Sequence, residues 1–99
     1  MTEIAIVDVA GSFAEDKDVA RNLRRELLLP ALERGELVTL DFAGVDLATQ
    51  SFVHALVSDA IRRLGPKALD QIIFKNCSEV IRTLVEIVSE YSQEGLTGD

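Results

Sequence analysis

The chain has 99 residues with 17 acidic and 10 basic side chains, which gives a formal net charge of −7. This charge argues against nucleic acid or an anionic membrane as a direct partner, because both bind through a cationic face. The single cysteine, Cys77, excludes an internal disulfide and is typical of a reducing compartment.

The length fits one domain. No apolar stretch approaches the ~20 residues that a membrane span needs, and the N-terminus lacks the basic and apolar regions of a signal peptide. We therefore expect one cytoplasmic domain over residues 1–91, followed by a polar, glycine-containing tail over residues 92–99 that is frayed or disordered.

The first predicted strand is Ile4–Val9. Its residues are apolar on both alternating faces apart from Asp8, a pattern typical of a strand that is covered on both sides in a parallel sheet. Gly11 ends this strand.

A first helix is predicted to begin within residues 13–18. Ser12 and Glu15 fit a capping box at its start, and Asp16 and Asp18 are alternative caps. The start of this helix is therefore defined only to within a few residues.

The second half of this helix is apolar on more than one face, with four leucines in the segment 27–32. Pro30 should kink or split the helix, and Gly35 should end it. Two interpretations of the widened apolar face stay open: burial beneath the sheet and the kinked segment, or a surface for a partner or a second copy.

The second predicted strand is Leu37–Phe42, and a second helix begins within residues 49–51 and ends at Leu64, before Gly65-Pro66. A third strand, Ile72–Phe74, is followed by a helix that reaches Tyr91. This last helix has Asn76 and Glu79 as its expected cap and N3 partner.

The order of elements is β-α-β-α-β-α, and it predicts a small α/β domain of three-layer type with a short, mostly parallel sheet. The first strand is expected in the centre, giving the strand order 2-1-3. So narrow a sheet has two open edges, which together with the segment 27–32 favours a homodimer. The expected core residues include Leu40, Phe52, Leu56, Ile73, Leu84 and Val88.

The motif Leu40–Val45, LDFAGV, resembles the core signature of STAS domains, the fold of the bacterial anti-sigma-factor antagonists. Two other segments share this resemblance: Ser51–Leu56, with its Ser-Phe and Ala-Leu pairs, and Ile72–Arg82, with its IIFKN strand and Ser-Glu-Val helix start. The resemblance covers about residues 37–90 and is most similar to the small STAS-like family of unknown function.

This resemblance implies a STAS-like, non-enzymatic regulatory module that acts through protein interaction. In partner-switching members a kinase phosphorylates a serine in the corresponding loop, and this modification decides which protein is bound. The usual acceptor corresponds here to Gln50 and the acidic residue before it to Thr49, whereas Ser51 keeps its type. The implied partners are a kinase-like ATP-binding protein and an anti-sigma-like or toxin-like protein.

The predicted site lies where the second strand, its loop and the second helix meet. Ser51 is the first phosphoacceptor candidate and Thr49 the second, although a hydroxyl at this position is also typical of a helix cap. His54 and Ser58 follow Ser51 at helical spacing and are predicted to be exposed. The predicted partner-binding surface comprises Asp41, Gly44, Asp46, Gln50, Ser51, Phe52 and His54.

An alternative function uses Asp8, Asp41 and Lys75, which are expected near strand ends. Two acids and a lysine in such places would resemble a receiver-like, magnesium-dependent phosphoacceptor domain. The main hypothesis involves no cofactor, no metal ligand and no catalytic residue.

Two basic clusters contrast with the acidic composition of the chain. Both are typical of solvated helix faces with local ion pairs, and either could instead dock an acidic partner. The first cluster comprises Arg21, Arg24 and Arg25, and the second comprises Arg62, Arg63 and Lys67.

Overall fold

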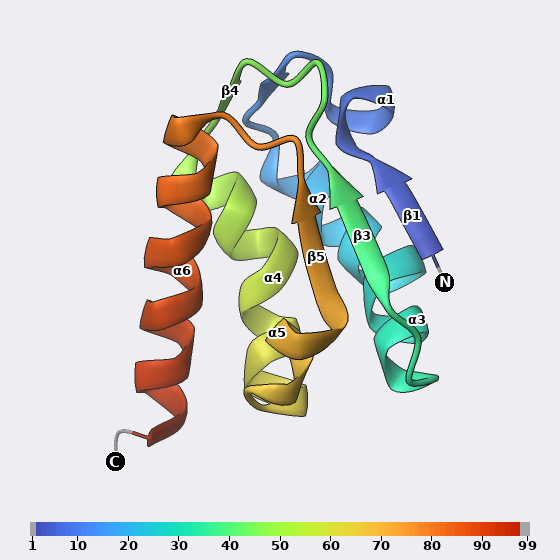
Figure 1. Ribbon diagram of the computed structural model, residues 1–99, viewed down its shortest axis with the longest axis vertical. Coiled ribbons are helices and arrows are strands. Elements are labelled where there is room, and N and C mark those ends of the chain that lie inside the picture. The colour runs from blue at the N-terminus through green and yellow to red at the C-terminus, as the bar shows by residue number, and fades with distance from the viewer. Residues whose placement is uncertain (1, 98–99) are drawn as a thin grey trace.

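The computed structural model describes the backbone of residues 2–97 and the side chains of residues 2–90 (Figure 1). Its elements are β1 Thr2–Ala5, α1 Ile6–Ala10, β2 Phe13–Ala14, α2 Lys17–Leu23, the π-helical segment η1 Arg24–Leu28, α3 Leu29–Glu33, β3 Val38–Asp41, β4 Leu47–Ala48, α4 Gln50–Leu64, α5 Lys67–Gln71, β5 Ile72–Lys75 and α6 Glu79–Thr97.

The main sheet has three parallel strands in the order β1-β3-β5. The α/β class and the parallel sheet are confirmed, but the predicted strand order is wrong, because the second predicted strand is central and not the first. Right-handed crossovers permit either order. The burial of three consecutive residues marks the central strand: Val38, Thr39 and Leu40 are all buried.

The first strand is shorter than predicted. It ends at Ala5, and Ile6–Ala10 forms a short helix that closes with a hydrogen bond from Gly11 N–H to the Val7 carbonyl oxygen. Asp8 and Val9 are exposed on this helix, so they are not strand residues covered on both sides. A short apolar run is compatible with either structure, which is why the pattern misled the assignment.

The helices α2, α3 and α4 lie behind the sheet in Figure 1, and the face toward the viewer carries none of them. Strand register places Glu3, Thr39 and Ile73 in one row. Ile73 is 44% exposed, so its expected place in the core is wrong. The described helices thus do not form the covering layer on both faces that a three-layer domain has.

An ion pair between the two edge strands lies over part of this open face. Lys75 Nζ lies 3.4 Å from Glu3 Oε2, so the pair joins the two edge strands across β3. Edge strands of a three-stranded sheet are roughly 9.6 Å apart, a span that two long side chains can bridge. Glu3 is in register with Thr39 and Lys75 with Asp41, and Thr39 is only 6% exposed although it lies in the open face.

The core lies between the sheet and the helices. Leu40, Phe52, Leu56 and Val88 are buried in it as expected, and Leu84 is partly buried against it. The leucine-rich run is also mainly internal, because Leu28, Leu29 and Leu32 are buried and only Leu27 is exposed. Burial is therefore the correct interpretation of most of the widened face.

The first predicted helix is a continuous run of α2, η1 and α3, and Asp16 is its cap, accepting a hydrogen bond of 2.9 Å from Asp18 N–H. Pro30 does not break the run. The turn before it widens instead, and Leu29 N–H bonds the Arg24 carbonyl oxygen five residues back. A π-helical turn is a usual accommodation of this kind. The run ends at Gly35 as predicted, with φ of 80°.

Several short elements were not predicted from the sequence. Phe13–Ala14 and Leu47–Ala48 form a separate two-stranded parallel sheet, and α5 follows Pro66. Helix α6 is capped by Ser78, whose Oγ accepts from Ile81 N–H at 3.2 Å, and not by Asn76. The backbone of α6 continues to Thr97, beyond the predicted end at Tyr91, and residues 98–99 of the expected tail lie outside the described residues.

Within the described part of the chain, no helix combines the length and the apolar character needed to cross a membrane.

Candidate functional site

The start of α4 is fixed by Thr49. Its Oγ1 accepts a hydrogen bond of 3.1 Å from Phe52 N–H, and its backbone is extended, with φ of −90° and ψ of 156°. A cap must occupy this last non-helical position, because its side chain has to reach back to the unpaired N–H groups of the first turn. Ser51 is already inside the helix, so its expected role as the cap is wrong.

The strand before Thr49 is held against the segment that leads into α2. Asp46 and Leu47 donate backbone hydrogen bonds to the Ser12 carbonyl oxygen at 2.8 and 3.2 Å, and Thr49 donates to Ala14 at 2.9 Å. These bonds and the β2–β4 pair bring the N-terminal ends of α2 and α4 together (Figure 1). The two helices then run side by side in the same direction.

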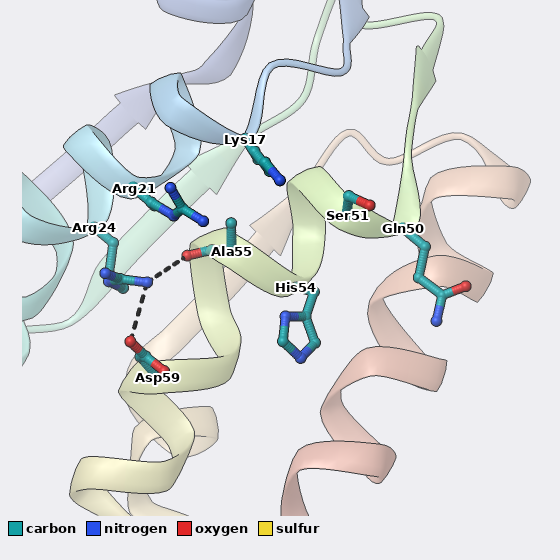
Figure 2. Close-up of a pocket in the computed structure, with 8 residues that line it drawn as sticks. All are labelled: Lys17, Arg21, Arg24, Gln50, Ser51, His54, Ala55 and Asp59. Carbon is teal, nitrogen blue, oxygen red and sulfur yellow. Dashed lines mark hydrogen bonds and ion pairs between the residues drawn. The ribbon is translucent and has the colours of Figure 1, made fainter.

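A groove with a cavity volume of about 570 Å³ lies on the surface where these helices meet. One wall is the cationic face of the first helical run, and the other is the exposed face of α4 (Figure 2). The lining residues are Lys17, Arg21, Arg24, Gln50, Ser51, His54, Ala55 and Asp59.

Arg24 joins the two walls. Its Nη1 donates to the Ala55 carbonyl oxygen at 3.0 Å and lies 3.1 Å from Asp59 Oδ2 (Figure 2). Only 14% of the Arg24 side chain is exposed, so this guanidinium serves as a fixed tie between the helices.

Lys17 and Arg21 are the accessible cations of the groove. Both are exposed, and Figure 2 shows them reaching from α2 toward the first turns of α4. Arg21 Nη1 pairs with Asp18 Oδ1 at 3.2 Å, but these side chains are 50% and 75% exposed. Such a surface pair contributes at most about 1 kcal/mol and exchanges readily.

The structure brings together three members of the predicted surface. Gln50, Ser51 and His54 are exposed and line the groove. Phe52 is fully buried, so it belongs to the core and cannot contact a partner. Ser58 is also buried, at 1% exposure, contrary to the prediction that it shares the exposed face with His54.

Asp41 holds two loops at the C-terminal edge of the sheet. Its Oδ1 accepts from Asn76 Nδ2 at 3.0 Å and from Ala43 N–H at 2.9 Å. The hydrogen bond from Asn76, followed by that from Ala43, lowers the pKa of the Asp41 carboxyl. Asp41 therefore has a structural role outside the groove.

Gly44 shapes the same edge. Its φ is 84°, and a Cβ built there would lie 3.3 Å from Val7 Cγ2, so the site favours glycine for two reasons. Asp46 is exposed in the loop, and only its backbone N–H makes a hydrogen bond, to Ser12, among the described interactions. Asp41, Gly44 and Asp46 do not line the groove.

The positions of the receiver-like residues do not favour that alternative. Asp8 is exposed on α1, the Asp41 carboxylate is engaged by Asn76 and Ala43, and Lys75 pairs with Glu3. Among the described residues, no three side chains of His, Cys, Asp or Glu are grouped closely enough to hold a metal ion.

Cys77 lies apart from the groove, before the Ser78 cap of α6. It is half-buried beside a smaller cavity of about 250 Å³ that Phe74, Arg82 and Val85 also line. Burial raises the pKa of the Cys77 thiol. The thiol is therefore less ionised than a free cysteine, as expected of a packing residue.

Arg21 and Arg24 were predicted to belong to a basic cluster, but their place beside Ser51 was not predicted, and Lys17 was not among the predicted site residues. The available signal was spacing: Lys17, Arg21 and Arg24 recur at i, i+4 and i+7, which places them on one helix face. The second wall of the groove, the exposed face of α4, could be predicted only from the β2–β4 pair, and each of these strands has only two residues.

The family model of the STAS-like domain of unknown function (DUF4325) matches residues 19–82. This match contains every groove residue except Lys17. No curated protein and no solved structure matched the chain. Since the family model covers well over half of the sequence, the chain belongs to the family of STAS-like domains of unknown function.

Proposed function

We propose that this chain is a non-enzymatic interaction module that binds a protein partner through the start of α4, and that phosphorylation of Ser51 switches this binding. Family membership supports the first part, because STAS-like domains often mediate protein interactions. The exposure of Gln50, Ser51 and His54 on one side of α4 provides a surface for a partner.

The observation that carries the proposal is the division of roles between two hydroxyl groups. Thr49 caps α4, and its oxygen is engaged by Phe52 N–H. Ser51 is exposed on the first turn, and no hydrogen bond of its side chain is found among the described residues. The hydroxyl of Ser51 is therefore accessible for modification without loss of the cap, which favours Ser51 over Thr49 as the acceptor.

A phosphate on Ser51 suits this position. It adds roughly −1.5 to −2 charges beside the positive end of the α4 dipole, and Lys17 and Arg21 line the same groove. In the transfer, a bond forms between Ser51 Oγ and the γ-phosphorus of ATP while the bond to ADP breaks. The hydroxyl proton passes to a base of the kinase-like ATP-binding partner.

The proteins served by this switch follow from the resemblance to partner-switching domains. The kinase-like ATP-binding protein is the modifying partner, and an anti-sigma-like or toxin-like protein is the partner that is bound or released. Ser51 occupies the place next to the usual acceptor, at which this chain has Gln50.

The test is phosphorylation in solution. The chain is incubated with ATP and a kinase-like ATP-binding protein from the same organism, and intact-mass spectrometry follows the addition of one phosphoryl group. We expect addition to the wild type and to Ser12→Ala, a nearby exposed hydroxyl control, but not to Ser51→Ala. Retained phosphorylation of Ser51→Ala would reject Ser51 as the acceptor.

A binding assay tests the switch itself. Ser51→Glu should weaken or exchange partner binding, whereas Ser51→Gln, which has the same shape without the charge, should bind as the wild type does. Equal binding of all three proteins would leave a constitutive binding subunit without a switch at Ser51.

A further inference from the structure

The groove between α2 and α4 concentrates positive charge on an acidic protein. Its lining contains three cations, Lys17, Arg21 and Arg24, and one carboxylate, Asp59, whereas the whole chain carries a net charge of −7. Asp59 is already paired with Arg24 at 3.1 Å. The charges of Lys17 and Arg21 are therefore the ones available to a ligand, apart from the exposed contact of Arg21 with Asp18.

The shape of the groove favours a chain segment over a small ion. It follows α4 from Gln50 to Asp59, nine residues further along, which is about 14 Å at the rise of an α-helix. An extended peptide of about four residues spans this length. Its lining includes Ala55, whose small side chain leaves room for a backbone.

The three cations follow one another along this length, and among the described interactions only Arg24 is paired with a residue of α4. The tie between Arg24 and Asp59 fixes the far end, and the two helices run in the same direction, so Lys17 lies beside the first turn of α4 with Ser51. Figure 2 shows this arrangement, with Lys17 and Ser51 at the end of the groove away from Asp59. Negative charge on a ligand is accordingly stabilised at the Lys17 end.

We propose that this groove docks an acidic segment of a protein partner, with Lys17 and Arg21 binding its carboxylates, and that negative charge on Ser51 closes the groove by competing for these two cations. The competition rests on the function proposed above, whereas the docking of an acidic segment does not. A phosphate on Ser51 would occupy the cations from within the protein and repel a carboxylate that enters the groove.

Fluorescence anisotropy with a fluorescein-labelled tetraglutamate peptide tests the docking. At low salt we expect saturable binding to the wild type that weakens as the ionic strength rises, because exposed charges are screened within about 10 Å at 0.1 M salt. The double variant Lys17→Ala/Arg21→Ala should bind about tenfold more weakly, as the loss of two exposed charge pairs predicts.

The matched control is Arg62→Ala/Arg63→Ala, which removes the same charge from exposed residues at the other end of α4. It should bind the peptide as the wild type does. Equal weakening of both double variants would show that net charge and not the groove attracts the peptide, and this result would overturn the proposal. So would the absence of saturable binding, or binding of inorganic phosphate at Lys17 and Arg21 without binding of the peptide.

The closure is tested with the same peptide. Ser51→Glu should bind the peptide severalfold more weakly than Ser51→Gln, which adds a side chain of the same size without the charge, and equal binding of the two variants would reject the closure. No kinase takes part in this titration, so its outcome is independent of the phosphorylation assay. If the chain binds the peptide but is not phosphorylated by the kinase-like protein, the switch at Ser51 is rejected and the docking groove is retained. If the chain is phosphorylated at Ser51 but does not bind the peptide, the docking groove is rejected and the phosphorylation site is retained.

Discussion

Thr49 and Ser51 lie two residues apart and have different physical roles. Thr49 ends the extended segment and satisfies a backbone N–H of α4, so its hydroxyl belongs to the fold. Ser51 is exposed on the first turn, so its hydroxyl belongs to the surface. The stability of the domain should accordingly depend on the first hydroxyl and be nearly independent of the second.

Substitution of each residue by alanine tests this difference. Thr49→Ala should lower the free energy of unfolding by about 1 kcal/mol, the usual cost of a lost cap. Ser51→Ala should change it by less than about 0.5 kcal/mol, as for other exposed positions. Urea unfolding measures both, and a larger loss for Ser51→Ala would mean that Ser51 is the cap after all.

Asp41 makes the stability of the fold sensitive to acid. Its hydrogen bonds from Asn76 and Ala43 lower its pKa in the folded chain. A lowered pKa gives a contribution that is fully present above the unfolded value, about 3.9, and is lost as the pH falls through the folded value. Asp41→Asn keeps an oxygen acceptor but does not titrate.

We therefore expect the wild type to lose more stability than Asp41→Asn when the pH is lowered from about 5 to about 2. Glu36, whose pKa is also lowered, chiefly by hydrogen bonds from Arg34 and Thr2, is present in both proteins and cancels in the comparison. Chemical denaturation at a series of pH values measures the two curves, which should diverge only below about pH 4. Parallel curves would refute a stabilising charge at Asp41.

At the scale of elements, α4 is the centre of the helical layer. It packs against α2 on one side and α6 on the other, which places its buried residues at the junction of three helices. Helix α6 contributes Ile81, Val85 and Val88 to this junction and leaves Val80 and Ile87 exposed. Its attachment thus depends on one face only.

Two isoleucines of α6 provide a matched pair. Ile81 is fully buried, so Ile81→Ala should cost about 2–5 kcal/mol of unfolding free energy. Ile87 is 45% exposed, and Ile87→Ala should cost less than about 0.5 kcal/mol. Thermal unfolding of both variants measures these losses of stability. Similar losses for Ile81→Ala and Ile87→Ala would mean that the assignment of the buried face of α6 is wrong.

The elements with long periodic patterns were predictable from sequence. Helix α4, its end at Gly65, and the strands β3 and β5 follow directly from apolar spacing and glycine signals. The order of the strands was not predictable, because the crossover rule allows both candidates. The groove was not predictable either, because its two walls are more than 25 residues apart in the sequence. They are brought together by the two-residue strands β2 and β4 and by the contact between Arg24 and Asp59.

At the scale of the whole molecule, the sheet is open on one face and at both edges. Eight large apolar side chains of the described residues are exposed, and no element carries more than two of them. Phe13 and Leu47 are neighbours in the β2–β4 pair, whereas Leu27, Ile73 and Ile87 belong to three other elements. The main reason to expect a homodimer, an exposed leucine-rich helix face, is largely removed by the burial of Leu28, Leu29 and Leu32.

The expected state of the isolated chain is therefore a monomer. Light scattering at micromolar concentration should give a mass near 10.8 kDa. Should it give twice that mass, two variants identify the surface responsible: Leu27→Asp charges the exposed leucine of the helical run, and Ile73→Asp charges the open face of the sheet. Each substitution affects an exposed side chain, so a change in mass reports association and not unfolding.

A dimer dissociated by Leu27→Asp alone would restore the interpretation of the segment 27–32 as a contact between two copies. A dimer dissociated by Ile73→Asp alone would mean that a second chain covers the sheet face that the helices leave open.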